Sequence, residues 1–426
     1  MARQSAHSKG VCDEGHDGPV SGDDVPFDPT DPAFLAEPYA RFAELRRSAE
    51  VHWHPGMGMA IAVSHRSCSV LLRDRALGRF FVDAEPAASF PAFNLLHHNS
   101  LLEHEPPDHT RLRSLVAAAF GRGHTQRLAS PVQRLADELV DELAEQIHEH
   151  GRADLLATVA GPLPVAVIAE LLGVPEPLQP ELRPWSNAIV KMYEYGLDEP
   201  RRAAAETAAA EFVTALRELA AHRRSAPADD LVSDLLAVAE ADGDRLTEDE
   251  LVGTAALLLM AGHEATVNTV GNGILALLRD RAQWERLGRE PDRDLLATAT
   301  EELIRFDPPL QLFERTATDD IEIAGYQLRP GQKIAALLGA AARDPAVFVE
   351  PDRLDVARHP NPHLGFGAGI HYCLGAPLAR VEVAAVLAAL CRRLPGLQLA
   401  AEPQRRPEFV MRGLRELWVT APPPPA

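Results

Sequence analysis

Cys373 has the surroundings most suited to chemistry in this chain. It lies in the run Phe366-Gly-Ala-Gly-Ile-His-Tyr-Cys-Leu-Gly375, just before a helical stretch that starts near Ala376. A thiolate at a helix start is stabilised by the positive end of the helix dipole and by unpaired backbone N–H groups, and it can then ligate a metal ion. The glycines let the backbone approach a flat ligand closely, and Phe366 can shield the sulfur from water. An isolated cysteine is more often a buried structural thiol, so this interpretation depends on the whole run.

A second segment, Leu257 to Asn268, is apolar for one turn and then carries small and charged residues inside a predicted helix. Glycine in a helix interior costs about 1 kcal/mol relative to alanine, so Gly262 indicates that something needs close access to the backbone. A local kink at Ala261 and Gly262 would open a groove there, and the alternative is a packing glycine at a helix crossing. Glu264 follows directly, and a carboxylate at such a position can carry protons between solvent and a site.

The composition limits the class of protein. The chain has 426 residues and a formal net charge of -20, which argues against a general nucleic-acid binder, since such proteins carry clustered positive charge. Four cysteines at irregular spacing favour neither a disulfide framework nor a zinc cluster, and they fit a reducing compartment. The first residues hold no apolar run of the length that a signal peptide or membrane anchor needs, so we expect a soluble, cytoplasmic protein without a membrane span.

Helical periodicity dominates the chain, and strand signals are short. Helices are expected at Gln133 to Glu149, Glu199 to Arg224, Glu248 to Asp280, Asp294 to Arg305 and Pro377 to Leu394, and strands within Val51 to Val63 and Ile321 to Ile334. This pattern predicts a mainly α fold with small peripheral β-sheets. We expect a single domain over residues 27–420, between a disordered tail (1–26) and a proline-rich tail (421–426). The phenylalanine-rich segment Gly78 to Ser100 is predicted to be either a core plug or a substrate lid.

The pattern Phe-Gly-x-Gly-x-His-x-Cys-x-Gly resembles the haem-binding loop of the cytochrome P-450 monooxygenases, and the likeness extends over Phe27 to Val419. It implies a triangular multi-helix haem protein of the soluble bacterial type. The cofactor would be heme b, with the Cys373 thiolate as the iron ligand whose electron density favours O–O cleavage. The other cofactor-binding residues that the resemblance implies are His109, Arg113, Ala261, Gly262, Arg315, Phe366, Gly367, His371 and Gly375.

Glu302 and Arg305 lie three residues apart, so they share one face of a predicted helix and can pair. Most such pairs are solvated and contribute less than roughly 1 kcal/mol. The position of this one, between the Gly262 segment and the Cys373 run, makes it a candidate for a buried pair. The P-450 family has a Glu-x-x-Arg pair at this position, which locks onto an arginine ahead of the haem loop. The resemblance assigns that part to Arg353.

The resemblance assigns catalysis to Glu264, Ala265 and Thr266, but this chain departs from the family pattern here. Relatives usually carry threonine directly after the acid, where this chain has Ala265. Thr266 is turned by about 100° around the helix and is expected to point elsewhere. Either a substrate hydroxyl or an ordered water then replaces the missing group, or the reaction is not a simple hydroxylation.

The resemblance implies an oxidoreductase that inserts one oxygen atom from O2, by hydroxylation or epoxidation, into a bulky, mostly hydrophobic small molecule, with a secondary metabolite as the expected class. Electrons from NAD(P)H would arrive through a ferredoxin reductase and a ferredoxin, and the enzyme is expected to be a monomer. The arginines expected to dock the redox partner are Arg73, Arg75, Arg111 and Arg122. The residues expected to line the substrate pocket are Phe80, Phe81, Phe93, Leu95, Ile189, Met192, Leu310, Leu312, Phe313, Val410 and Met411.

Two alternatives stay open. Ala265 also suits a haem-thiolate enzyme that uses peroxide, or that rearranges or couples its substrate without inserting oxygen. A non-catalytic haem sensor would retain Cys373 but would need neither Glu264 nor an electron partner.

Overall fold

The structure, a computed structural model, describes residues 26–120, 123–241, 246–289 and 292–422. Its α-helices are α1 (Pro32–Ala36), α2 (Tyr39–Ser48), α3 (His65–Arg73), α4 (Pro91–His98), α5 (Asp108–Phe120), α6 (His124–His150), α7 (Pro162–Leu172), α8 (Gln179–Val190), α9 (Glu199–Ser225), α10 (Leu231–Ala241), α11 (Glu248–Arg279), α12 (Arg281–Arg289), α13 (Arg293–Phe306), α14 (Leu338–Ala341) and α15 (Ala376–Arg393). Its strands are β1 (Val51–His54), β2 (Met59–Ala62), β3 (Leu77–Gly78), β4 (Ala153–Asp154), β5 (Leu312–Ala317), β6 (Ile321–Ile323), β7 (Tyr326–Leu328), β8 (Lys333–Leu337), β9 (Gln398–Leu399) and β10 (Trp418–Thr420).

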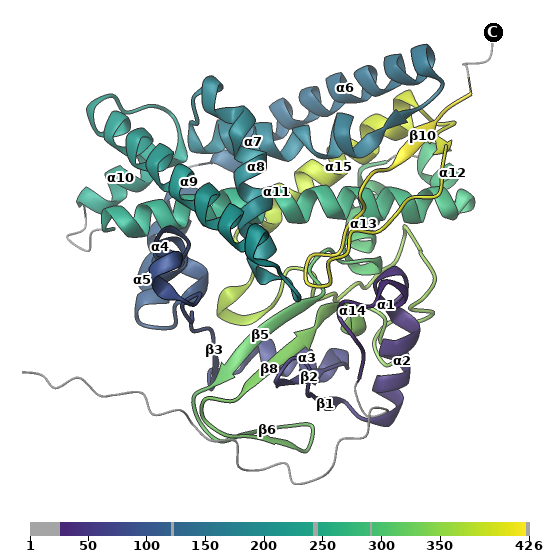
Figure 1. The fold of residues 1–426 in the computed structure, drawn as a ribbon. Coiled ribbons are helices and arrows are strands. Elements are labelled where there is room, and N and C mark those ends of the chain that lie inside the picture. Colours follow the sequence, from purple (N-terminus) through teal and green to yellow (C-terminus); the bar gives the residue numbers. More distant parts are fainter. Residues whose placement is uncertain (1–25, 121–122, 242–245, 290–291, 423–426) are drawn as a thin grey trace, which may run out of the picture.

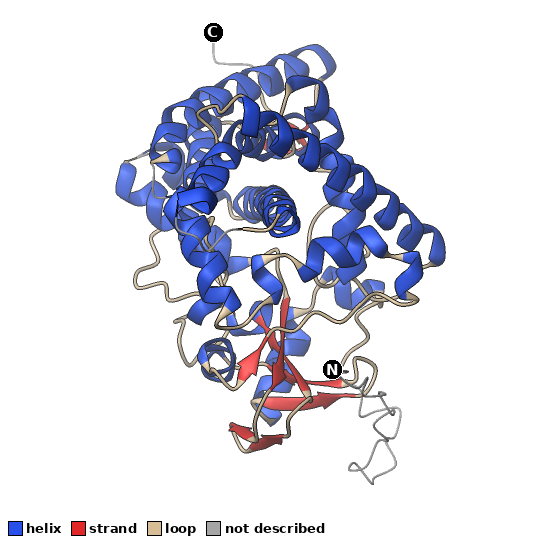
Figure 2. Ribbon diagram, turned by 90° about the vertical axis from the view of Figure 1, so that its left-hand side faces the viewer, coloured by secondary structure: helices blue, strands red, loops and turns tan. Residues whose placement is uncertain are grey.

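Helix α11 is the axis of the helical part. Figure 1 shows it crossing the middle of the helices, and Figure 2, which views it along its length, shows other helices arranged as a ring around it. A capping box fixes its start, because Thr247 accepts a hydrogen bond from the backbone N–H of Glu250 while the Glu250 carboxylate accepts one from the N–H of Thr247. A helix surrounded in this way is buried on most of its faces, which explains its largely apolar sequence.

The strands lie mainly to one side of the helices (Figure 2). The largest sheet has the order β1-β2-β8-β5-β3, in which β2 and β8 run parallel and the other neighbours run antiparallel. The parallel register pairs Ala60 with Ile334 and Ala62 with Ala336. Two smaller sheets have the orders β4-β10-β9 and β6-β7. The large hydrophobic core lies among the helices, and two smaller cores pack against the five-stranded sheet.

The predicted mainly α fold with small sheets is confirmed. The five predicted helices are present with ends that agree within one or two residues, except that α6 starts nine residues before the predicted Gln133. The predicted strand regions each contain a hairpin, β1–β2 and β6–β7. The segment Gly78 to Ser100 contains a helix, α4, which the phenylalanine content does not predict. Residues 1–25 and 423–426, which make up nearly all of the predicted tails, lie outside the described residues.

The segment around Ala261 and Gly262 does not interrupt the helix. Helix α11 is a continuous α-helix from Glu248 to Arg279. A Cβ atom added at Gly262 would lie 3.5 Å from Cδ1 of Ile168, which is an ordinary packing distance, so alanine would also fit there. A tight helix crossing therefore does not explain this glycine. No helix in the described parts of the chain is both long and apolar enough to cross a bilayer.

Candidate active site

The loop before α15 has the tight backbone that its glycines predict. Gly367 and Gly369 adopt φ angles of 69° and 70°, in the left-handed region that side chains rarely adopt. A Cβ atom at Gly369 would collide with the backbone oxygen of Leu72, so this glycine lets the loop press against the end of α3. The backbone N–H of Cys373 donates to the carbonyl of Phe366 over 3.0 Å, which closes the loop. The sulfur is thereby held at the start of α15.

The Cys373 sulfur lies among groups that favour its charged form. The backbone N–H groups of Gly375 and Ala376 donate to it, and Arg113 and Arg380 lie near it. Burial nevertheless raises the pKa of the Cys373 thiol above its ordinary value. A coordinated metal ion deprotonates a thiol, so the donor set fits a sulfur that ligates iron.

Two side chains near the loop, Arg315 and His109, have a buried nitrogen without a partner. Arg315 is 2% exposed, its Nη1 donates to the carbonyl of Glu314, and its Nη2 has no partner. Burial lowers the pKa of Arg315 to about 9. His109 is equally buried, and its Nε2 also has no partner. Because an unpaired buried cation is costly, these orphaned donors fit an acidic ligand such as the carboxylates of a haem group.

His371 and Arg113 complete this set. The His371 ring lies 4.4 Å from the His109 ring, and its Nε2 donates to Glu105 over 2.8 Å. Arg113 donates from Nη2 to the carbonyl of Tyr372 over 2.7 Å, beside the cysteine. The structure thus gathers the predicted cofactor-binding residues His109, Arg113, Arg315 and His371 around the cysteine loop. Their contacts with a cofactor remain a prediction.

In the middle of α11, one face is accessible while the other faces are buried. Leu257, Leu258, Gly262 and Ala265 are partly accessible and Ala261 is exposed, whereas the side chains between them are buried. A spacing of three and four residues places these five on one side of the helix. This accessible face is free of charged groups. It contains Ala261, Gly262 and Ala265 of the predicted site.

The two polar residues that flank Ala265 point into different surroundings. Glu264 is buried, and its Oε2 accepts from Nη2 of Arg406 over 3.3 Å. Thr266 lies 3.4 Å from a carboxylate oxygen of Glu382, a residue of α15, to which it donates. Thr266 therefore turns away from the accessible face, as its position in the helix predicts. The side chain at Ala265 is a methyl group with no hydroxyl to offer.

Glu382 and Arg406 also belong to the site and are not predicted from the sequence. Glu382 is completely buried, and burial raises its pKa to about 8, so the carboxyl is protonated at neutral pH. A single acid in the apolar stretch Val381 to Val386 is a signal that could have identified it. Arg406 comes from the irregular C-terminal segment, where periodicity offers no such signal.

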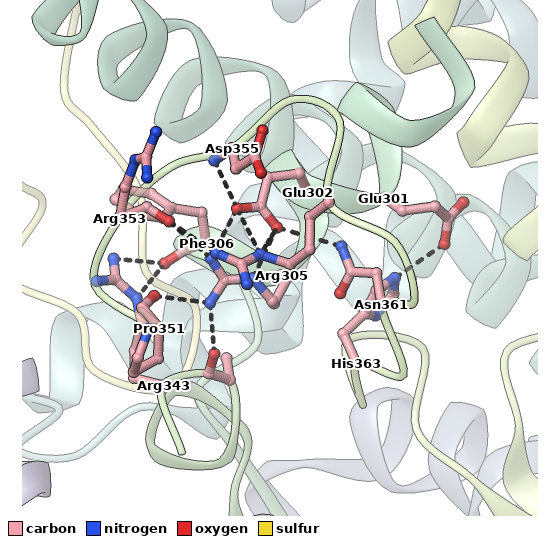
Figure 3. Close-up of polar contacts among 12 residues, drawn as sticks. Glu301, Glu302, Arg305, Phe306, Arg343, Pro351, Arg353, Asp355, Asn361 and His363 are labelled. Atoms are coloured by element: carbon pink, nitrogen blue, oxygen red, sulfur yellow. Dashed lines mark hydrogen bonds and ion pairs between the residues drawn. The ribbon is translucent and has the colours of Figure 1, made fainter. Parts of the chain in front are cut away.

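Glu302 and Arg305 form a buried pair, shown in Figure 3. Both side chains are 0% exposed, and Arg305 donates from Nε and Nη2 to the two carboxylate oxygens over 2.7 and 2.8 Å. Arg305 also donates to the carbonyls of Ala342 and Pro351, and the backbone N–H of Asp355 donates to Glu302. Since nearly every donor finds a partner, this pair can anchor the segment that leads to the cysteine loop.

The third arginine of this network is Arg358, so the prediction that Arg353 takes this position is wrong. Nε of Arg358 lies 3.1 and 3.0 Å from the oxygens of Glu302. The Arg353 side chain is 59% exposed and pairs with Glu350 instead. A turn in which the N–H of Arg358 donates to the carbonyl of Asp355 brings the later arginine back to the carboxylate. Spacing along the sequence cannot show that turn.

Glu301 links this network to the cysteine loop. Its carboxylate accepts from His363 and from Arg380, and these two bonds lower its pKa to about 2. Arg380 in turn lies 4.5 Å from the ring of Phe366. Phe366 therefore sits against a fixed cation on α15.

The predicted pocket residues fall into two groups. Phe80, Phe81, Leu95, Met192, Leu310, Phe313 and Met411 are partly or fully accessible, whereas Phe93, Ile189, Leu312 and Val410 are buried in the hydrophobic cores. A residue of the second group can support the wall of a pocket but offers little surface to a ligand. Leu310 and Met411 are brought together by an isolated β-bridge.

Polar contacts of Glu194 and Tyr193 join the segments that carry these residues. The Glu194 carboxylate accepts hydrogen bonds from the consecutive backbone N–H groups of Phe409, Val410 and Met411 over 2.7 to 2.9 Å. The Tyr193 hydroxyl lies 2.6 Å from Nε2 of His97 on α4 and donates to it, because Nδ1 of His97 donates to a backbone carbonyl. The segment between α8 and α9 is thus tied both to the C-terminal segment and to α4.

The arginines predicted to dock the redox partner differ in exposure. Arg73 and Arg75 are exposed. Arg111 is half-buried and forms an ion pair with Glu250, and its docking role stays a prediction. Arg122 lies outside the described residues.

Comparison with known proteins identifies the family. The family model described as Cytochrome P-450 matches residues 51–423. The chain is 37% identical to the cytochrome P-450 monooxygenase PikC of Streptomyces venezuelae, over 90% of this chain and 91% of that one. It is 35% identical to the polyketide biosynthesis cytochrome P-450 PksS of Bacillus subtilis, over 90% and 93% of the two chains. The crystal structure of P450BioI bound to an acyl carrier protein that bears hexadec-9Z-enoic acid superposes with a TM-score of 0.85 at 32% identity, covering 92% of this chain and 100% of that one. This chain belongs to the cytochrome P-450 family and is a haem-thiolate monooxygenase.

Proposed function

We propose that the protein hydroxylates or epoxidises a bulky, mostly hydrophobic secondary metabolite. The observation that carries this proposal is the accessible face of α11, where Leu257, Leu258, Ala261, Gly262 and Ala265 present no charged group. A substrate that rests against such a face must be largely apolar. PksS is named for polyketide biosynthesis, and P450BioI binds a long acyl chain, which supports the same class of substrate here.

Each residue of the site would have its own role in the reaction. Haem, when bound, supplies the redox chemistry that activates O2. Cys373 would hold the iron, while Arg113, His109, Arg315 and His371 would pair with the acidic groups of the cofactor. Phe366 would keep water from the sulfur. Glu264 would hold the proton that the reaction needs, and a substrate hydroxyl or a bound water would occupy the place beside Ala265.

The proposal also covers the electron donor, the cellular location and the oligomeric state. We infer a ferredoxin that is reduced by NAD(P)H through a ferredoxin reductase and that serves a cytoplasmic monomer. The contact between Gly369 and the end of α3 supports docking beside the cysteine, since it places Arg73 directly next to the cysteine loop. Exposed Val70, Ile370 and Tyr372 give the same region the apolar surface that an interface needs.

A screen of candidate metabolites tests the substrate class. Each compound is titrated into the holoenzyme, and the absorption shift that follows loss of the iron-bound water is recorded. Polyketides, terpenoids and fatty acyl compounds should give the shift, whereas small charged metabolites should not. A shift only with charged metabolites would contradict the proposal.

Ala265 favours one alternative reaction, in which peroxide replaces O2 and the electron donors. That enzyme would form product with hydrogen peroxide and without a reductase. Product formation that depends on NAD(P)H, ferredoxin and substrate together would exclude it. A non-catalytic sensor is not proposed, because the relatives include a named monooxygenase.

A further inference from the structure

A polar cavity of about 100 Å³ leads from the surface to Glu264. Arg183 of α8 and Arg415 of the C-terminal segment are exposed and form its outer part. Its inner part is lined by His263, Glu264 and Asn268 of α11, all of which are at most 3% exposed. This cavity, here called the His263 chamber, therefore connects solvent with the buried interior of α11.

Three unpartnered polar atoms belong to residues that line the His263 chamber. Both ring nitrogens of His263 and Oδ1 of Asn187 are buried without a hydrogen-bond partner among the described residues. Leaving such an atom unpaired costs roughly 1 to 3 kcal/mol. Burial lowers the pKa of His263 to about 4, so the ring is neutral and has one donor and one acceptor nitrogen.

These atoms match water better than any other ligand. Together they offer one donor and two acceptors, which is what a chain of water molecules can satisfy. Each water takes about 30 Å³, so the chamber has room for roughly three. Glu264 is within reach of the chamber, and its described bonds to Arg406 and Asn268 are long, at 3.3 to 3.4 Å, so the carboxylate is loosely held.

We propose that the His263 chamber holds ordered water and that His263 relays protons through it from solvent to Glu264. The proposal rests on the proposed role of Glu264. In the reaction RH + O2 + NAD(P)H + H⁺ → ROH + H2O + NAD(P)⁺, two electrons come from NAD(P)H, and two protons must enter the site from solvent. His263 accepts a proton from water at one nitrogen and releases another from the second, so its charge is unchanged. Exchange with the chamber water then restores the starting tautomer.

Two variants separate water binding from proton relay. His263→Phe removes both nitrogens, whereas His263→Gln keeps a donor and an acceptor but cannot exchange protons as an imidazole does. Thr254→Val is the matched control, because Thr254 is another buried residue of α11 with an unpartnered hydroxyl and it does not line the chamber. All three are prepared as holoenzymes and are compared by their thermal unfolding and their carbon monoxide spectra.

The first measurement is the crystal structure of each holoenzyme. Wild type and His263→Gln should show ordered water bonded to residue 263, and His263→Phe should lose it. A dry chamber in the wild type, or a chloride or other anion bound between Arg183 and Arg415 in place of water, would overturn the proposal. This readout does not depend on turnover, so it stands even if the proposed oxidation fails.

The second measurement is product formed per NAD(P)H, compared with product formed with hydrogen peroxide, which brings its own protons. Both His263 variants should fall about tenfold with NAD(P)H and keep most of the peroxide-driven yield, while Thr254→Val stays near wild type. Equal yields for His263→Gln and wild type would show that water alone carries the protons and would overturn the role of His263. An equal loss in both assays would assign His263 to stability. If the wild type forms no product in either assay, the proposed function fails instead.

Discussion

At the scale of single residues, the site is built from side chains that lack a partner within the protein. Arg315 and His109 each keep a buried nitrogen unpaired, and burial raises the pKa of the Cys373 thiol although backbone N–H groups and arginines favour its charged form. Folding these groups without a ligand costs free energy, so the bound cofactor should stabilise the folded state.

Replacing Cys373 by alanine tests the iron ligand. The reduced wild type with carbon monoxide should absorb at about 450 nm, as thiolate ligation of haem implies, and Cys373→Ala should lose this band. Cys391→Ala is the control, because Cys391 is buried in the core away from the loop. An unchanged spectrum in Cys373→Ala would remove the central assignment.

Glu382 should make stability depend on pH. Its pKa is about 8 in the folded protein against 4.5 ordinarily, so the folded state holds one more proton than the unfolded state between these values. Stability from this group is therefore highest below about pH 4.5 and falls as the pH rises to about 8, by at most about 1.4 kcal/mol per pH unit. Glu382→Gln should remove this slope. Urea unfolding of both proteins at pH 5 and pH 8 checks it, and equal slopes would contradict it.

Ala265 should matter only when the substrate lacks its own hydroxyl. With the natural substrate, product per NAD(P)H should be high in wild type and unchanged or lower in Ala265→Thr. With an analogue that lacks the hydroxyl near the oxidised carbon, the wild type should form about 5- to 150-fold less product per NAD(P)H. This loss corresponds to one relay hydrogen bond of about 1 to 3 kcal/mol. Ala265→Thr should restore the yield with the analogue. An equal gain for both substrates would show that Ala265 is merely tolerated.

At the scale of elements, helix α13 is bonded to the segment that precedes the cysteine loop through two adjacent acids. Glu302 binds Arg305 and Arg358, and Glu301 binds His363 and Arg380. The first acid faces a fully buried network and the second a half-buried one. The position of the loop is therefore fixed relative to both α13 and α15.

Arg358→Ala and Arg353→Ala are matched variants that test whether the Glu302 network anchors the cysteine loop. Arg358→Ala leaves part of the buried Glu302 carboxylate unpaired, at a cost of up to about 3 to 5 kcal/mol out of a total stability of about 5 to 15 kcal/mol. We expect little soluble holoprotein from Arg358→Ala and a normal yield from Arg353→Ala, whose side chain is 59% exposed. Yield and haem content per protein are the measurements. A normal yield from Arg358→Ala and a low yield from Arg353→Ala would show instead that Arg353 is the third arginine of the network.

At the scale of the whole molecule, the proposed partner surface lies where α3 meets the cysteine loop. Charge-steered binding weakens as the Debye length falls from about 10 Å at 0.1 M salt to about 3 Å at 1 M. Reduction by ferredoxin should therefore slow at high salt, and Arg73→Glu should slow it at low salt. Arg289→Glu, on α12 elsewhere on the surface (Figure 1), should have little effect. Rates that ignore both salt and Arg73 would contradict this docking site.

The long helices and the cysteine run could be predicted because their signals are local. Helical periodicity identified α9, α11 and α15 nearly to the residue, and the pattern around Cys373 predicted a tight loop at a helix start. Arg358 could not be chosen over Arg353, because the choice depends on a turn that spacing does not reveal. The His263 chamber was equally hidden, since its lining comes from residues 154–157, α8, α11 and the C-terminal segment, which only the folded chain brings together.

Glu194 has a consequence for how a ligand enters and leaves. The Glu194 carboxylate accepts from three consecutive backbone N–H groups, so separating the two segments would leave three backbone donors without a partner. Residues 191–195 and 409–411 should therefore move together as one rigid unit. On the other side, Tyr193 of this unit donates to His97 of α4, and Glu206 of the adjoining α9 accepts from the backbone N–H groups of Ala92 and Phe93 of α4. A movement of this unit away from α4 must therefore break these bonds, and it should carry residues 409–411 along with residues 191–195.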